Sequence, residues 1–236
     1  LLKIPGSVVF VSWSTAFFVS EFVSSQEEIL DLISKIHNEI SGIKIGLQYI
    51  TQHSPEDIKA LAKFNKPIFY DGKFFDIKNT LVESIKSLKD LNVSYATVHL
   101  LNGLESLKAA NEAASEINVK LLGVSVLTSF GDEDLELLGF KDQVEKQVIR
   151  LIKIADKANL YGVICSPLEI KMIKEIAPKL KCFTPGIRQD DSKNDQKRTM
   201  NAKQALEAGS DCLIIGRPIT KGDPKKNIQE ILSSIN

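Results

Sequence analysis

The chain of 236 residues has few of the side chains that build disulfide frameworks and metal sites. Its three cysteines, Cys165, Cys182 and Cys212, show no C-x-x-C spacing, and its three histidines are scattered along the sequence. Three cysteines without paired spacing argue against a disulfide scaffold and a zinc site, and they favour a reducing cytosol. We therefore expect a cytoplasmic protein that holds no metal.

Neither sign of charge predominates in the sequence. Lys and Arg together number 30, and Asp and Glu together also number 30. This balance gives no reason to expect a nucleic-acid partner, so any anionic ligand must be attracted locally. The apolar content of 43% and the charged content of 25% are typical of an ordinary soluble globular protein.

A long membrane-spanning run is also missing, although residues 4–20 carry no charge. This stretch contains Pro5, Gly6 and five Ser or Thr residues, so it is a poor candidate for a membrane span. It also has no clear basic leader or small-residue cleavage site, which a secretory signal would need. We expect residues 1–16 to be an N-terminal extension or an added edge segment, and we expect no membrane association.

Short apolar runs rich in Val, Ile and Phe alternate with helix-like stretches. Apolar residues recur at three- and four-residue spacing in segments such as 29–36 and 144–155, which predicts amphipathic helices between the runs. The alternation predicts a parallel sheet covered by helices. Eight runs are predicted to be strands, at residues 17–21, 43–47, 67–71, 95–100, 120–127, 161–165, 181–184 and 211–215.

Eight strands predict an α/β protein of the (β/α)8 TIM-barrel class, with one domain over residues 1–236. An open doubly wound sheet would give the same alternation. However, no G-x-G-x-x-G follows the first strand, so a dinucleotide-binding fold is the weaker interpretation.

The segment from Asp71 to Asp76 places two carboxylates around Lys73 at the end of the third predicted strand. Side chains at positions 71 and 73 of a strand point the same way, so a carboxylate and an ammonium would lie side by side. Such a pair keeps the lysine charged and can supply a proton at a defined point. A salt-bridge cluster that caps a helix is the structural alternative. Lys44, inside the second strand, also needs a carboxylate partner unless it extends to solvent.

A glycine and an arginine follow each of the last two predicted strands. Gly186 and Arg188 follow the seventh strand, and Gly216 and Arg217 follow the eighth. The loops after these two strands bind phosphate in many TIM barrels. Glycines let backbone N–H groups approach the phosphate, and each arginine offers a planar fork of donors. We therefore predict a phosphate site here, with residues 189–198 as a mobile lid.

Five motifs in order resemble those of the orotidine 5'-phosphate decarboxylase family, in its bacterial form, over about residues 17–236. The resemblance implies a barrel that uses no metal or cofactor and acts as a homodimer. It also implies the conversion of orotidine 5'-monophosphate to uridine 5'-monophosphate in de novo pyrimidine synthesis. The motifs are Asp71-x-Lys73-x-x-Asp76-Ile77-x-Asn79-Thr80, Val126-Leu127-Thr128-Ser129, Pro185-Gly186-Ile187-Arg188, Asp195-Gln196-Lys197-Arg198 and Gly216-Arg217-Pro218-Ile219-Thr220.

The resemblance implies a role for each matched residue. Lys73 would be the proton donor, within a charged catalytic array that also contains Lys44, Asp71 and Asp76. Asp76 would be contributed across the dimer interface. The substrate-binding residues that the matches imply are Lys44, Asp71, Asp76, Ile77, Asn79, Thr80, Thr128, Pro185, Arg188, Gln196, Gly216 and Arg217.

The first strand departs from the family's pattern. Family members have an aspartate there that contacts the ribose, whereas this chain has Glu21, one methylene longer. If residues 8–12 form the first strand instead, the acid is missing. The helix opening at residues 25–28 and the distance to Lys44 favour Glu21.

Two other functions remain open at this point. A Mg²⁺-dependent sugar-phosphate decarboxylase or an aldolase-like relative would share the D-x-K-x-x-D centre. The altered first strand motivates the second alternative, a catalytically silent barrel that binds a phosphate ligand.

Overall fold

A computed structural model describes residues 18–19, 25–188 and 199–235 of the chain. Eight strands form one sheet in chain order, and every neighbouring pair is parallel. The strands predicted from the sequence are therefore confirmed, in an α/β fold of the TIM-barrel type. They are β1 (Phe18–Val19), β2 (Gly42–Ile45), β3 (Ile68–Phe74), β4 (Val93–His99), β5 (Lys120–Val124), β6 (Gly162–Ile164), β7 (Lys181–Thr184) and β8 (Cys212–Leu213).

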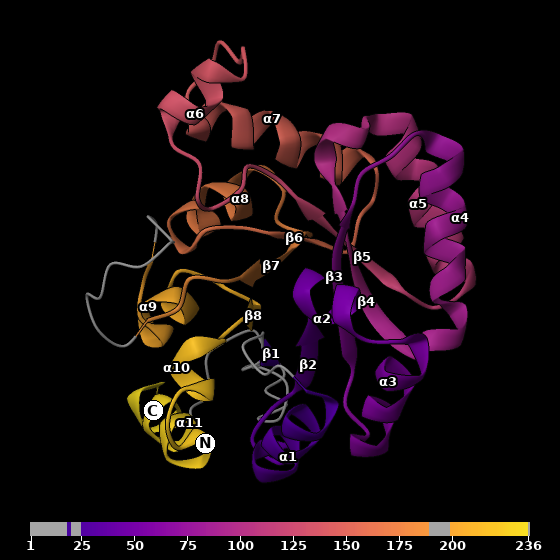
Figure 1. Ribbon diagram of the computed structural model, residues 1–236. Helices are drawn as coiled ribbons and strands as arrows, with labels where there is room; N and C mark the ends of the chain where they lie inside the picture. The colour runs from indigo at the N-terminus through magenta and orange to yellow at the C-terminus, as the bar shows by residue number, and fades with distance from the viewer. Residues whose placement is uncertain (1–17, 20–24, 189–198, 236) are drawn as a thin grey trace.

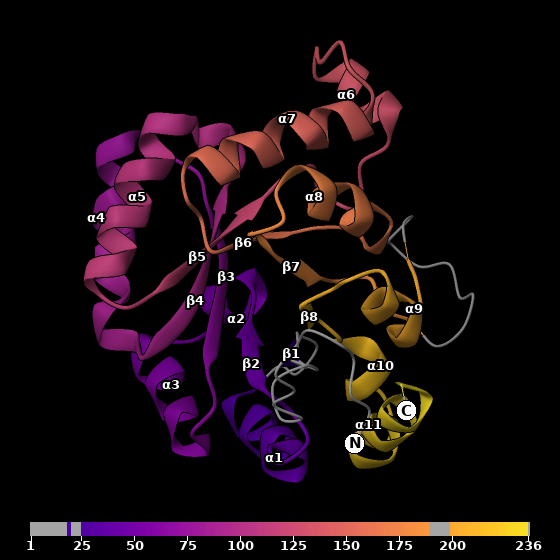
Figure 2. The same cartoon turned by 180° about the vertical axis from the view of Figure 1, so that it is seen from behind.

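Helices surround the curled sheet, as the two opposite views show (Figures 1 and 2). In the part of the chain that the structure describes, no helix is long and apolar enough to cross a membrane. The α-helices are α1 (Gln26–Ile36), α2 (Leu47–Gln52), α3 (Pro55–Ala60), α4 (Lys78–Lys86), α5 (Leu104–Glu116), α6 (Asp132–Leu137), α7 (Val144–Lys157), α8 (Ile170–Ile176), α9 (Ala202–Glu207), α10 (Arg217–Thr220) and α11 (Pro224–Ile235). Within the described residues, four short 3₁₀ turns lie between a helix and a strand: η1 (Leu61–Phe64), η2 (Ser87–Leu91), η3 (Leu100–Asn102) and η4 (Pro167–Glu169).

Helix α1 shows how the local sequence sets an element. The hydroxyl of Ser25 accepts a hydrogen bond from the Glu28 amide, and the Glu28 side chain accepts one from the Ser25 amide. This capping box satisfies two amides at the start of the helix. Leu32, Ile33 and Ile36 then place a buried stripe against the sheet, as the three- and four-residue spacing predicted.

The core has two parts because successive strand residues point to opposite faces of the sheet. Ile68 belongs to the large cluster between sheet and helices, whereas its neighbour Phe69 belongs to a smaller cluster on the other face. Phe69 packs there with Phe183, with ring centroids 6.2 Å apart. The inner space of the sheet is therefore filled with side chains at this level.

The N-terminal ends of the strands carry an aromatic and cationic cluster. Lys120, the first residue of β5, lies over the ring of Tyr161 with Nζ 4.5 Å from its centroid. Burial and the neighbouring Tyr161 raise the pKa of Tyr95 to about 12, which keeps this phenol neutral. Such packing at the N-terminal face serves stability, and the active sites of TIM barrels lie at the opposite, C-terminal ends of the strands.

Candidate active site

Two lysines meet one buried carboxylate at the C-terminal end of β3. The Nζ atoms of Lys44 and Lys73 lie 2.8 and 2.9 Å from the same oxygen, Oδ2 of Asp71. The side chains of Lys44 and Asp71 are 10% and 9% exposed, whereas that of Lys73 is 34% exposed. The side chain of Lys73 is therefore the more accessible of the two lysines. The predicted side-by-side placement of Asp71 and Lys73 is confirmed.

The backbone of this segment is not the regular strand that the two-residue repeat assumed. The sheet pairs Tyr70 with Ala96 and Phe74 with Val98, so the three residues between Tyr70 and Phe74 face one residue of β4, Thr97. Strand β3 therefore continues past its predicted end at residue 71, through a bulge. Lys73 lies within the bulge at a φ of 47°, in the left-handed region that side chains other than glycine rarely adopt. Bulges near active sites commonly redirect a side chain.

The ionisation of Asp71 is set by the two lysines. Burial raises the pKa of this carboxyl, but the charges and hydrogen bonds of Lys44 and Lys73 outweigh burial and lower the pKa to about 2. Asp71 is therefore a carboxylate at neutral pH. The second oxygen, Oδ1, accepts a hydrogen bond from the hydroxyl of Thr97 at 2.9 Å.

Asp76 lies apart from this array, in the exposed turn between β3 and α4. Its carboxylate accepts a hydrogen bond from the Ile77 amide at 2.7 Å, and its own amide donates to Oδ1 of Asn102 at 3.1 Å. Ile77 is 73% exposed, and the predicted residues Asn79 and Thr80 are exposed in the first turn of α4. These four residues form an outward surface beside the array.

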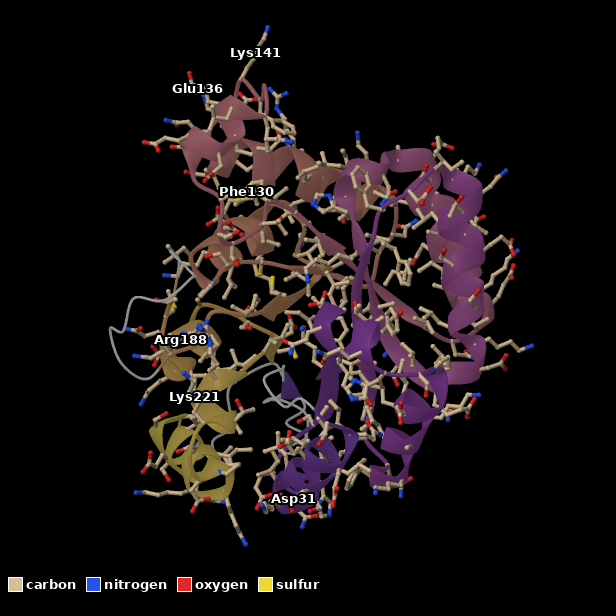
Figure 3. All side chains as sticks on the ribbon, in the orientation of Figure 1. Asp31, Phe130, Glu136, Lys141, Arg188 and Lys221 are labelled. Carbon is tan, nitrogen blue, oxygen red and sulfur yellow. The ribbon has the colours of Figure 1, made fainter. Side chains whose placement is uncertain are left out.

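The predicted phosphate residues lie after β7 and β8, which are neighbours in the sheet. Gly186 has a φ of 82°, which a glycine adopts without strain, and the Gly186 carbonyl accepts a hydrogen bond from Met200 at 3.3 Å. Gly216 directly precedes α10, whose first residue is Arg217. Figure 3 shows Arg188 near α9, on the same side of the molecule as α10. Pro185 is half-buried between β7 and Gly186.

Three of the predicted binding residues belong neither to the array nor to the loops after β7 and β8. Thr128 lies in the turn after β5 and is half-buried. Glu21 and Gln196 lie outside the described residues, as do the alternative first strand at 8–12 and the predicted lid at 189–198.

Sequence reasoning missed Thr97 and Asn102, which support this site from β4 and the turn after it. Threonine is common in strands, so a threonine within a predicted strand gives no sign of a special role. Only the register of β3 against β4 shows that Thr97 opposes the bulge. The amide group of Asn102 donates to the carbonyls of Phe74 and His99 at 3.0 and 2.8 Å, and so holds the turn that carries Asp76.

His99, the last residue of β4, also lies close to the array. Burial and the nearby charge of Lys73 lower the pKa of this imidazole, which favours its neutral form. Its Nδ1 accepts a hydrogen bond from the Leu101 amide at 3.3 Å. Within residues 18–19, 25–188 and 199–235, no group of three or more His, Cys, Asp or Glu side chains is placed to hold a metal ion.

The sequence pattern of the orotidine 5'-phosphate decarboxylase / HUMPS family matches residues 20–231. The chain belongs to this family. An orotidine 5'-phosphate decarboxylase of Wolbachia pipientis subsp. Culex pipiens is 39% identical over 210 residues, covering 88% of this chain and 93% of the relative. The enzyme of the same name from Ehrlichia canis is also 39% identical, over 209 residues, with 88% and 92% coverage.

A solved orotidine 5'-phosphate decarboxylase, from Lactobacillus acidophilus, has the same fold. It is 31% identical, covers 94% of this chain and 99% of its own, and superposes with a TM-score of 0.81. The resemblance inferred from the motifs is therefore confirmed for the orotidine 5'-phosphate decarboxylase / HUMPS family.

Proposed function

We propose that the chain is an orotidine 5'-phosphate decarboxylase, a carboxy-lyase that acts in de novo pyrimidine synthesis. The observation that carries this proposal is the carboxylate of Asp71 shared by Lys44 and Lys73 at the C-terminal end of β3. Relatives of the same name, 39% identical over most of the chain, support the choice of substrate. The substrate is orotidine 5'-monophosphate, and the products are uridine 5'-monophosphate and CO₂.

In the proposed reaction, the bond between C6 of the pyrimidine and its carboxylate breaks, and the electron pair stays on C6. This charge lies in the ring plane, where the ring carbonyls cannot easily delocalise it. The ammonium of Lys73 stabilises the developing charge and then transfers a proton from Nζ to C6. The neutral amine of Lys73 regains its proton from water after product release.

The charge of the array supports this role. Two lysines and one aspartate carry a formal charge of +1 (two positive and one negative) in a mostly buried site. This +1 charge belongs to one chain alone, and Asp76 of the other subunit would neutralise it in the proposed dimer. The attraction between the Lys73 ammonium and C6 still strengthens as negative charge builds on that carbon. Asp71 keeps Lys73 protonated and oriented until the proton is transferred.

The phosphate of the substrate lies far from C6 in the proposed complex. Arg188, Gly216 and Arg217 hold it, together with Pro185, at the ends of β7 and β8. Binding energy from this remote group orders the reacting end of the substrate and raises the rate of the chemical step. Thr128 and Gln196 contact the pyrimidine or the phosphate in this proposal, and Glu21 contacts the ribose.

The proposal includes a homodimer in which Asp76 completes the partner's array. Its support is the outward surface after β3, where Phe75 and Ile77 are 62% and 73% exposed. A groove of about 460 Å³, partly lined by Asn79 of α4 and Glu112 of α5, continues this surface. Exposed apolar side chains beside a groove are typical of a contact surface. A second copy of the chain would bury them and bring Asp76 to the other site.

We also propose that the sheet closes by pairing β8 with β1 into a complete (β/α)8 barrel. The support is that β1 and β8 are the two edges of a single sheet of eight parallel strands in chain order. Closure would make residues 1–236 one domain, with residues 1–16 as an extension. A cytoplasmic location is supported by the three cysteines, which are buried as free thiols.

The decisive experiment follows the loss of orotidine 5'-monophosphate absorbance with purified protein, with and without EDTA. We expect turnover that chelation leaves unchanged. Lys73→Ala should reduce kcat nearly to background while uridine 5'-monophosphate still binds, because a proton donor acts in the chemical step.

Each contrary result points to another function. Activity lost in EDTA and restored by Mg²⁺ would favour the sugar-phosphate decarboxylase or aldolase-like alternative. Nucleotide binding without turnover would favour the silent barrel. Near-normal turnover in Lys73→Ala would exclude this lysine as the donor.

A further inference from the structure

Thr97 lies in β4 opposite the bulge that carries Lys73, and its side chain makes two hydrogen bonds there. Its Oγ1 accepts from the backbone amide of Lys73 at 2.8 Å and donates to Oδ1 of Asp71 at 2.9 Å. Thr97 is fully buried, with 0% exposure. One hydroxyl therefore connects the backbone of the lysine to the carboxylate that pairs with its ammonium.

The direction of these hydrogen bonds is fixed by chemistry. A backbone N–H can only donate, so the hydroxyl oxygen of Thr97 must accept from Lys73. The single hydrogen of the hydroxyl is then free for the acceptor Asp71. Because the two lysines occupy Oδ2 and Thr97 occupies Oδ1, both oxygens of the carboxylate are held.

The bulge explains why a side chain that accepts a hydrogen bond is needed at position 97. Where three residues of β3 face one residue of β4, the regular pattern of backbone hydrogen bonds is interrupted. The amide of Lys73 donates to the Thr97 hydroxyl instead of a strand carbonyl. The left-handed conformation of Lys73 is unfavourable for any residue with a Cβ, so it persists only where neighbouring groups hold it.

We propose that Thr97 is a positioning residue for Lys73: its hydroxyl holds the bulge in the conformation that aims the ammonium at the reacting carbon. The proposal rests on the proposed function for the reaction that Lys73 performs. It assigns Thr97 no contact with the substrate.

The test uses three variants of the full-length protein. Thr97→Val keeps the shape and removes both hydrogen bonds, and Thr97→Ser keeps the hydroxyl. Ser210→Ala is the matched control. Ser210 lies in the loop between α9 and β8, is also buried, and donates a hydrogen bond to the carbonyl of Cys212 at 3.1 Å. Thermal unfolding, kcat and KM for orotidine 5'-monophosphate are measured for each.

We expect Thr97→Val to lower kcat about 10- to 100-fold, the scale of a small misplacement of a catalytic group, with KM changed less than about threefold. Thr97→Ser should recover most of the wild-type kcat. Ser210→Ala should lower the Tm but keep kcat. A crystal structure of Thr97→Val should show the contact between Lys73 and Asp71 lengthened or the φ of Lys73 changed.

The outcomes separate this inference from the proposed function. A wild-type kcat in Thr97→Val would overturn the inference, and so would a low kcat that Thr97→Ser fails to restore, since that would indicate packing alone. If the wild type itself shows no turnover, the proposed function fails. The crystal structure then decides the positioning role, because an unchanged bulge in Thr97→Val contradicts it.

Discussion

At the scale of single residues, the site depends on how one buried carboxylate balances two ammonium groups. Asp71 is the anionic partner that the structure gives to both Lys44 and Lys73. A buried ion pair gives little net stability, but removing one partner leaves an uncompensated charge and is strongly destabilising. We therefore expect Asp71 to affect folding as well as the proposed catalysis.

The pH dependence of stability provides a test at Asp71. Its pKa is lowered to about 2 in the folded chain, against roughly 3.9 in the unfolded chain. A carboxyl whose pKa is lowered by folding stabilises the folded chain at pH values above its unfolded pKa. This contribution is lost as the pH falls from about 4 to about 2. The difference in unfolding free energy between wild type and Asp71→Asn should therefore shrink by on the order of 2 kcal/mol across that range.

Urea denaturation at a series of pH values measures this difference. Asp31→Asn is the control, since Asp31 pairs with Lys35 at the exposed surface of α1 and is labelled in Figure 3. Exposed pairs contribute little, so this variant should stay close to wild type throughout. A difference for Asp71→Asn that does not change between pH 5 and pH 2 would contradict the lowered pKa.

At the scale of elements, the two loops after β7 and β8 are expected to bind the phosphate. Arg217→Ala removes a charged fork of donors at the start of α10, and it should weaken uridine 5'-monophosphate binding by about 2–4 kcal/mol. Uridine has no phosphate, so its affinity should barely change. Calorimetry with both ligands measures the two effects.

Arg150→Ala is a suitable control for the loss of a positive charge. Arg150 pairs with Asp142 at 2.6 Å and is 68% exposed on α7, so its removal should leave both affinities unchanged. Equal losses for nucleotide and nucleoside in Arg217→Ala would mean that Arg217 supports the fold and that the phosphate binds elsewhere.

The elements also show how far a sequence predicts a site. Apolar runs predicted all eight strands, because a buried parallel strand needs apolar side chains on both faces. Strand β3 was predicted to end at Asp71, since apolar residues give way there to charge and glycine. In the structure, β3 continues to Phe74 through the bulge. No periodicity signals a bulge, so the partner that it requires, Thr97, could not be found from sequence.

The same limit applies to the turn after β3. The motif identified Asp76, but its geometry depends on Asn102, which lies 26 residues further along the chain. Contacts between distant residues are set by the register of β3 against β4, and sequence spacing does not contain that register. The sequence therefore predicted that Asp71 and Lys73 lie side by side, but it did not predict which side chains hold this segment.

At the scale of the whole molecule, the position of Asp76 has consequences for assembly. Lys73 belongs to the charged array of its own chain, where it pairs with Asp71. Asp76 instead lies on the exposed turn, next to the apolar side chains of Phe75 and Ile77. A symmetric dimer through this surface would give each site one Asp76 from the other chain. Activity would then require two copies even though each chain carries its own Asp71 and Lys73.

Mixed dimers test this arrangement. Homodimers of Lys73→Ala and of Asp76→Ala should both be nearly inactive. After subunit exchange, a hybrid dimer has both lesions in one site and neither in the other. An equal mixture should therefore recover about a quarter of the wild-type activity, since half of the dimers are hybrids with one intact site.

The control mixes Lys73→Ala with Asp71→Asn. Asp71 pairs with the lysine of its own chain, so each site of that hybrid keeps one lesion and no activity should return. Exchange is confirmed independently by native mass spectrometry of differently tagged subunits. If the first mixture stays inactive while exchange is complete, Asp76 acts within its own chain, and the turn held by Asn102 must move inward to reach Lys73.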